Sequence, residues 1–202
     1  MCISQQTYNI HPGFKMATTE EQTVNGVDVS ALEDAVGAIS EDPEIGRFTF
    51  RAKTTWEDAL KSVTSIDEFD QAGETVHTQE FTLQGDEPEQ ILGERAGPNA
   101  VELLLGALGS CLSVGYAANA AHMGIEIDKL RLEMEGDVDL RGFLGITTDV
   151  RPGYESISCT VHVDADAPKE ELVELRERVE STSPLVDVIT NEVPLNTRII
   201  VE

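Results

Sequence analysis

Cys111 is the residue whose type and surroundings best suit chemistry in this chain. Its neighbours Gly109, Ser110, Ser113 and Gly115 are small, so we expect them to leave space beside the sulfur for another molecule. A thiolate is nucleophilic, whereas burial raises the pKa of a thiol and makes it inert. A reactive Cys111 therefore needs a cation or several hydrogen-bond donors nearby. The alternative, which residue type alone favours, is that Cys111 is a small core residue.

The other cysteines and the histidines suit chemistry less well. Cys159 is in phase with apolar residues of a predicted strand, which indicates a core position, and Cys2 lies in a polar N-terminal tail. His77 and His162 fall on predicted strands without a second ligand at metal-site spacing, and His122 lies near a predicted helix end. The chain contains no phosphate loop, no G-x-G-x-x-G and no G-x-S-x-G. We therefore expect no bound metal and no cofactor.

The charge balance excludes some partners. The 202 residues include 38 acidic and 14 basic side chains, which gives a net charge of -24. Such a surface repels nucleic acid and anionic lipid, so we expect neither as a partner. The even spread of Asp and Glu favours adaptation to concentrated salt, where screening reduces self-repulsion. An ordinary acidic protein is the alternative.

The cysteine count and the N-terminus indicate the compartment. Three cysteines form no disulfide framework, which favours a reducing environment. The N-terminus has no positively charged segment leading into an apolar run, so we see no secretory signal. We therefore expect a cytoplasmic protein.

One apolar run must position Cys111. Residues 103–125 include no Asp, Glu, Lys or Arg, and we expect them to form a helix that is buried on all sides. Asn99 is the expected N-cap and Gly124 the expected terminating residue. The run is long enough to cross a membrane, but its serines, its four glycines and the lack of a flanking basic cluster favour a soluble core helix.

The chain before residue 44 is predicted to be an extension of a main domain at 44–202. We expect a mobile tail followed by an amphipathic helix over 28–41, capped by Asp28 or Ser30. Met16 is an alternative start of translation.

Strands and helices then alternate through the main domain. Period-two patterns predict a strand from Arg47 to Trp56 and two more at 61–66 and 75–83, which together form an antiparallel meander. After the polar loop 85–99 and the central helix, strands are expected near 130–134 and 157–163. A helix begins at Pro168, a helical turn covers 185–189, and a last strand covers 195–201. This order is typical of an α+β protein.

Three ordered segments resemble the OsmC/Ohr family, the osmotically inducible and organic-hydroperoxide-resistance proteins. The segments are GPNAVELLLGALGSCLS, GIEIDKLRLEMEGDVDLRGFLG and STSPLVDVITNEVPL, and the likeness covers roughly residues 47–202. It implies antiparallel sheets around a long buried central helix and an intertwined homodimer with two sites between its subunits. It also implies a thiol peroxidase that reduces organic hydroperoxides through a sulfenic acid.

Residue by residue, the resemblance makes Cys111 the peroxidatic cysteine. Where peroxidase branches of the family have Cys-Pro, this chain has Ser183-Pro184, so no resolving cysteine is evident. The position of the catalytic carboxylate is Val101, and Glu102 is adjacent but points about 100° away on a helix.

No position clearly matches the activating arginine of the family. Lys61 is closest in chain order, and Arg51 and Lys53 are alternatives on the polar face of a strand. We therefore take Cys111, Glu102 and Lys61 as the candidate catalytic residues.

Two functions remain open from the sequence. The first is a one-cysteine peroxidase that acts on a small hydroperoxide, with Cys111 as nucleophile and an external thiol as reductant. The second is a divergent, non-catalytic protein that binds an apolar small molecule in the same pocket. A purely structural dimer is a third interpretation.

Overall fold

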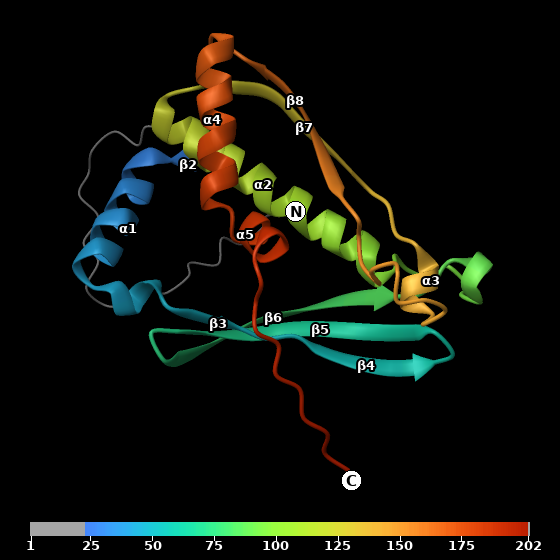
Figure 1. Cartoon of the computed structure of the whole chain (residues 1–202). Coiled ribbons are helices and arrows are strands. Elements are labelled where there is room, and N and C mark those ends of the chain that lie inside the picture. The colour runs from blue at the N-terminus through green and yellow to red at the C-terminus, as the bar shows by residue number, and fades with distance from the viewer. Residues whose placement is uncertain (1–22, 202) are drawn as a thin grey trace, which may run out of the picture.

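A computed structural model describes residues 23–201 of the chain. The predicted tail, Cys2 and Met16 lie outside these residues. Within them the protein is a mixed α+β fold with two antiparallel sheets and a long central helix, as the sequence predicts. Figure 1 shows the sheet of β3–β6 at one side of the molecule and the β7–β8 hairpin beside helices α2 and α4.

The central helix α2 runs over Ala100–Met123 with both predicted ends. The Asn99 side chain accepts from the N–H of Glu102, and the Glu102 carboxylate accepts from the N–H of Asn99, which forms a capping box. Gly124 ends the helix at φ +71°, where glycine carries no steric cost. By length and composition α2 could cross a membrane, with a mean hydropathy of 1.5, and within the protomer it packs against α4 and β7.

The expectation that α2 is buried on all sides is wrong for this protomer. One side carries the buried residues Leu108, Leu112 and Tyr116, whereas Val114 on the other side is 67% exposed. The reason is that α4 and β7 cover one side of the helix only.

The core lies between α2, α4 (Lys169–Thr182) and the hairpin of β7 (Ile127–Gly136) and β8 (Ile157–Ala165). Leu175 and Val179 of α4 are fully buried against α2. Gly115 permits this approach, because a Cβ atom there would lie 3.0 Å from Cγ1 of Val179. The small residues of α2 thus serve helix packing.

The β7–β8 pair has the predicted face. Leu130, Leu132 and Met134 lie opposite Val163, Val161 and Cys159. The predicted glycine-rich connection between the two strands also holds a short helix, α3 (Leu140–Phe143). Asp139 is its N-cap, and the Asp139 side chain accepts from the N–H of Arg141.

The first sheet is the predicted meander with its first strand broken in two. Strands β3 (Phe48–Phe50) and β4 (Lys53–Asp58) both pair with one edge of β5 (Lys61–Gln71), and β6 (Glu74–Gly85) pairs with the other. The half-buried pattern expected of Arg47–Trp56 is wrong, since Phe50 is 76% exposed and Trp56 is 69% exposed. In the described part of the chain, no residue of this sheet belongs to the buried core.

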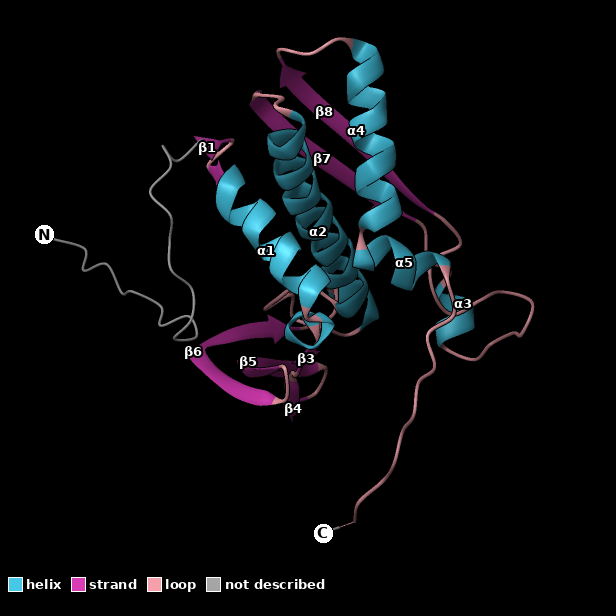
Figure 2. Cartoon of the chain, turned by 90° about the vertical axis from the view of Figure 1, so that its left-hand side faces the viewer, coloured by secondary structure: helices cyan, strands magenta, loops and turns pink. Residues whose placement is uncertain are grey.

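The N-terminal extension is anchored by one amide. A small hairpin, β1 (Thr23–Val24) and β2 (Val27–Asp28), precedes α1 (Val29–Glu41) and the 3-10 turn η1 (Pro43–Gly46). The Asn25 side chain donates to the carbonyl of Ile125 at 2.9 Å and accepts from the N–H of Ile127 at 2.8 Å. Asp28 caps α1, as predicted, and Figures 1 and 2 show α1 and α2 on the same side of the sheet of β3–β6.

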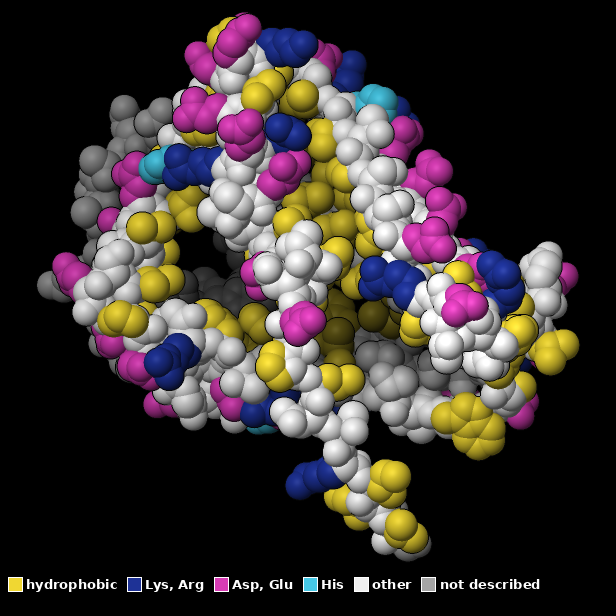
Figure 3. All heavy atoms as spheres, in the orientation of Figure 1, with side chains coloured by type: hydrophobic (Ala, Val, Ile, Leu, Met, Phe, Trp, Pro, Cys, Tyr) yellow, Lys and Arg dark blue, Asp and Glu magenta, His cyan; other side chains and the backbone are white. Residues whose placement is uncertain are grey.

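The C-terminal end differs from expectation. Helix α5 (Pro184–Thr190) confirms the helical turn predicted at 185–189, but residues 195–201 form no strand because no strand of the described protomer pairs with them. Leu195 and Ile199 are 87% and 92% exposed, and Figure 3 shows hydrophobic side chains along this segment.

The contact of Gly115 with Val179 gives a stability test. Gly115→Leu should lower the free energy of unfolding by about 1–3 kcal/mol, since its side chain would overpack the α2–α4 core. Gly37→Leu on the open face of α1 is the matched control and should be neutral or stabilising, because nothing lies within 4 Å of its Cβ position. Chemical denaturation followed by circular dichroism measures both. Equal effects of the two substitutions would contradict the packing role.

Candidate functional site

Cys111 lies near the middle of α2 and is partly buried. Its sulfur is 3.3 Å from the hydroxyl oxygen of Ser183, the residue that precedes α5. The two residues are 72 positions apart in sequence, and the packing of α4 and α5 against α2 brings them together. The sequence comparison with peroxidase branches singled out both positions, and the fold places them in direct contact.

Ser183 is a buried hydroxyl with a fixed orientation. Its side chain is the N-cap of α5 and accepts from the N–H of Val186 at 3.3 Å, and the residue is 7% exposed. Pro184 follows at the first helical position, which suits its fixed φ. A hydroxyl that accepts from the backbone keeps its own hydrogen available for the sulfur.

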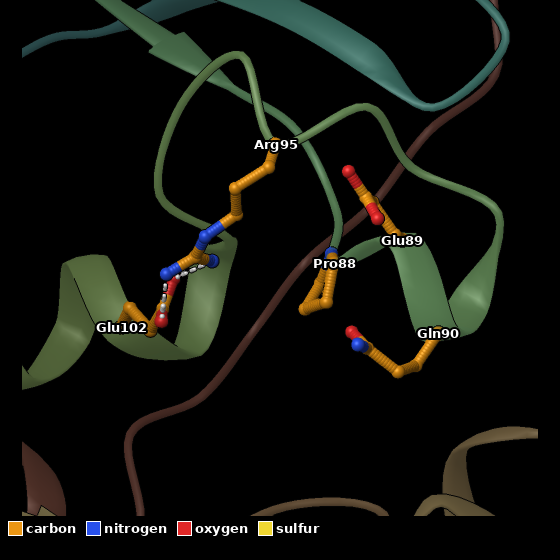
Figure 4. A pocket seen from close by; sticks show the side chains of 5 residues that line it. All are labelled: Pro88, Glu89, Gln90, Arg95 and Glu102. Carbon is orange, nitrogen blue, oxygen red and sulfur yellow. Dashed lines mark hydrogen bonds and ion pairs between the residues drawn. The ribbon is translucent and has the colours of Figure 1, made fainter.

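Glu102 forms an ion pair far from Cys111 in the same protomer. Arg95 donates two hydrogen bonds to its carboxylate, at 2.6 and 2.7 Å, and these lower the pKa of Glu102. Nine residues of helix separate Glu102 from Cys111, a rise of about 13.5 Å. The pair borders a hollow of about 380 Å³ together with Pro88, Glu89 and Gln90, shown in Figure 4. Cys111 does not line this hollow.

Arg95 is held by a loop that Asp86 organises. The Asp86 carboxylate, 2% exposed, accepts from the backbone N–H groups of Glu87, Glu94 and Ala96 at 2.8–3.0 Å. The N–H of Ala96 is the largest of several causes that hold the pKa of Asp86 below its usual range. Sequence reasoning missed this residue, because an Asp in a polar loop carries no signal of its three backbone partners.

The predicted activating cations are each paired with a carboxylate. Lys61 donates to Glu94 of the same loop at 2.6 Å, and this hydrogen bond raises the pKa of Lys61. Arg51 pairs with Asp70, and Lys53 lies 3.6 Å from Asp67. In residues 23–201, no Lys or Arg side chain forms a hydrogen bond with Cys111, whose one side-chain partner there is Ser183.

The small residues near Cys111 divide between close packing and the lining of a groove. Gly115 packs on Val179, and a Cβ atom added at Gly109 would lie 3.6 Å from Cε of Met134. An open groove of about 460 Å³ runs along a different side of α2, lined by Leu105, Gly106, Gly109, Ser110, Ser113, Leu130, Leu132 and Met134. Gly109, Ser110 and Ser113 thus leave open space beside the helix, and Cys111 itself does not line this groove.

The remaining candidates stay apart from Cys111. Cys159 is exposed rather than part of the core, although its neighbours partly desolvate it, and this raises the pKa of its thiol. His77 lies 3.4 Å from Glu68, and His162 lies 3.0 Å from Glu133, both on strands. Among the described residues no three His, Cys, Asp or Glu side chains lie together as metal ligands.

Comparison with known proteins places the chain in a family. The family model of OsmC-like protein matches residues 93–198. No curated protein sequence matches the chain significantly. An OsmC-like protein from Mycoplasma pneumoniae shares the fold, with a TM-score of 0.55, 16% identity, and coverage of 70% of this chain and 87% of the other.

Two further structures are similar. A putative osmotic stress induced and detoxification response protein from Psychrobacter arcticus has a TM-score of 0.51 at 14% identity, covering 67% and 85% of the two chains. An organic hydroperoxide resistance protein OsmC from Legionella pneumophila has a TM-score of 0.49 at 15% identity, covering 70% and 88%. Because the family model spans just over half of the 202 residues, including the helix of Cys111 and the segment of Ser183, the chain belongs to the OsmC-like protein family.

Proposed function

We propose that the protein is a thiol-dependent peroxidase that reduces organic hydroperoxides through Cys111. The observation that carries this proposal is the contact of Cys111 on the central helix with the buried hydroxyl of Ser183, in a chain of the OsmC-like family. Cys111 is the one cysteine of the described chain that has a hydrogen-bonding side chain beside it.

In the first step the Cys111 thiolate attacks the terminal oxygen of the hydroperoxide. The O–O bond breaks, the alkoxide leaves and takes up a proton as the alcohol, and the sulfur becomes a sulfenic acid. The sulfur is oxidised by two electrons and the peroxide is reduced by two.

In the second step an external thiol reduces the sulfenic acid of Cys111. Its thiolate attacks the sulfenic acid, releases water and forms a mixed disulfide, and a second thiol then frees Cys111. The reason for an external reductant is that Ser183 occupies the position nearest the sulfur and cannot form a disulfide. Cys159, on β8, is a free thiol, and the hydrogen bond of Cys111 is to Ser183.

Lys61 and Glu102 contribute directly only if a second copy of the chain brings them to the sulfur. Within their own protomer they bind Glu94 and Arg95. We therefore place their proposed catalytic roles across a dimer interface.

We propose a homodimer because the protomer leaves apolar faces uncovered. Val114 on α2 is 67% exposed, and the sheet of β3–β6 exposes Phe50 and Trp56. The C-terminal segment exposes Ile199 and Ile200 at 92% and 70%. A second copy would bury such surfaces on both partners at once, as a two-fold interface does.

Binding of an apolar small molecule without turnover is the second candidate function. The groove between α2 and β7 favours it, since Leu105, Leu130 and Leu132 line the groove and Cys111 does not. Retention of an apolar ligand by a Cys111→Ser variant, together with no peroxide consumption by the unmodified protein, would favour this candidate.

Oxidation of Cys111 tests the peroxidase. Treatment with substoichiometric cumene hydroperoxide should add one oxygen at Cys111, detected by intact-mass spectrometry and peptide mapping, because the thiolate is the nucleophile. Cys111→Ser should abolish both this addition and thiol-dependent peroxide consumption. Cys159→Ser is the matched control and should keep both. Equal oxidation with and without Cys111 would eliminate the proposal.

Replacement of Val114 tests the dimer. Sedimentation in molar salt, which screens the net charge of -24, should give about twice the chain mass of 22.0 kDa. Val114→Glu should shift the protein to monomer, because it places a charge in the apolar face of α2. Val173→Glu, on the partly exposed face of α4, is the control and should leave the dimer intact. A monomeric unmodified protein would contradict the assembly.

A further inference from the structure

We propose that Ser183 is a positioning residue for Cys111, whose hydroxyl donates a hydrogen bond to the thiolate and holds the sulfur for reaction. This inference rests on the proposed role of Cys111 as nucleophile. It assigns a functional task to the residue that stands where a second cysteine would otherwise close a disulfide.

The geometry fixes the direction of this hydrogen bond. The oxygen of Ser183 lies 3.3 Å from the Cys111 sulfur and accepts from the N–H of Val186, also at 3.3 Å. A thiolate has no hydrogen, so the hydroxyl is the donor of this contact once Cys111 is ionised. Hydrogen bonds to an ionised acceptor are stronger than those between neutral groups.

Burial of Ser183 strengthens its hydrogen bond to the sulfur. Ser183 is 7% exposed, so few water molecules compete for its hydroxyl. The residue is fixed by α5, which packs on both α2 and α4 through partly buried residues such as Leu185 and Val186. The hydroxyl is thus held beside the sulfur before any substrate arrives, and its orientation costs little at the moment of reaction.

No other side chain of the described protomer provides this support. Arg95 and Lys61, the nearest candidates by chemistry, are occupied by Glu102 and Glu94. A donor to the charged form lowers a thiol pKa, as an opposite charge does. Ser183 is therefore the residue of the described protomer whose side chain lies within hydrogen-bond reach of the Cys111 sulfur.

The pH dependence of alkylation tests this role independently of peroxide. In a background with Cys2→Ser and Cys159→Ser, iodoacetamide should modify Cys111 with a rate that follows its thiolate fraction. Ser183→Ala should move the midpoint upward by about one pH unit, which is about tenfold less thiolate at a pH below both midpoints. Ser183→Thr, which keeps the hydroxyl, should restore the midpoint.

A matched control separates the hydroxyl from the helix cap. Pro184→Ala loosens the start of α5 and leaves the Ser183 hydroxyl in place, so its alkylation midpoint should stay within a few tenths of a pH unit. An unchanged midpoint in Ser183→Ala, or an equal shift in Pro184→Ala, would overturn the proposal.

A second variant tests the position of the side chain. Ser183→Cys in the same background should form an internal disulfide with Cys111. The Ser183 oxygen that the new sulfur replaces lies 3.3 Å from the Cys111 sulfur, and rotation of the two side chains can close this gap to the S–S distance of about 2.05 Å. Diamide is the oxidant: it takes up the two electrons and two protons of the thiols, and the protein loses two hydrogens in intact mass. Adding Cys111→Ser to Ser183→Cys removes the partner, and that protein should keep its mass.

The outcomes for Ser183 and for the peroxidase are distinguishable. A midpoint shift and a disulfide without any peroxide oxidation of the unmodified protein would leave Ser183 as a positioning residue and end the peroxidase proposal. Peroxide oxidation with no midpoint shift and no disulfide would leave the peroxidase and overturn the role of Ser183.

Discussion

The packing of α4 and α5 against one side of α2 is the constraint on which the site depends. Val179 reaches the helix backbone closely because Gly115 offers no side chain there, and Leu175 is fully buried in the same core. This contact sets the depth at which α4 ends and therefore where Ser183 lies relative to the sulfur. A core that excludes voids keeps such a distance narrow, whereas a surface contact would not.

The residues of the site consequently differ in how closely they are packed. The contact of Cys111 with Ser183 is built entirely within one protomer and from its best-packed elements. The loop that carries Arg95 and the sheet that carries Lys61 lie outside the buried core and have apolar neighbours exposed to solvent. Folding alone thus positions the proposed nucleophile, whereas Lys61 and Arg95 pair with other carboxylates within the protomer.

Much of this fold could be predicted from the sequence because local signals agree with the tertiary structure. Asn99, Gly124 and Asp28 mark helix ends by chemistry that needs no distant partner, and the structure confirms them. The break between β3 and β4 and the absence of a strand at 195–201 depend on strand pairing, which period-two patterns do not contain.

The candidate site divides in the same way. The family likeness pointed to Cys111 and Ser183, and both lie together. The partners of Glu102 and Lys61 could not be predicted, since an acidic chain offers each cation many carboxylates. Only the folded loop pairs Lys61 with Glu94 and Arg95 with Glu102. The role of Asp86 could not be predicted for a related reason. Its hydrogen-bond donors are backbone N–H groups, which nearly every residue has whatever its side chain.

The anchoring of that loop has a consequence for its response to salt. The ion pair of Lys61 with the largely exposed Glu94 is subject to screening, and it weakens as ionic strength rises. The three hydrogen bonds to Asp86 are short-range and shielded from solvent, so mobile ions have little access to them. The loop therefore keeps its shape through a carboxylate bound to uncharged backbone groups, and a change in salt would loosen its connection to the sheet before it altered the loop itself.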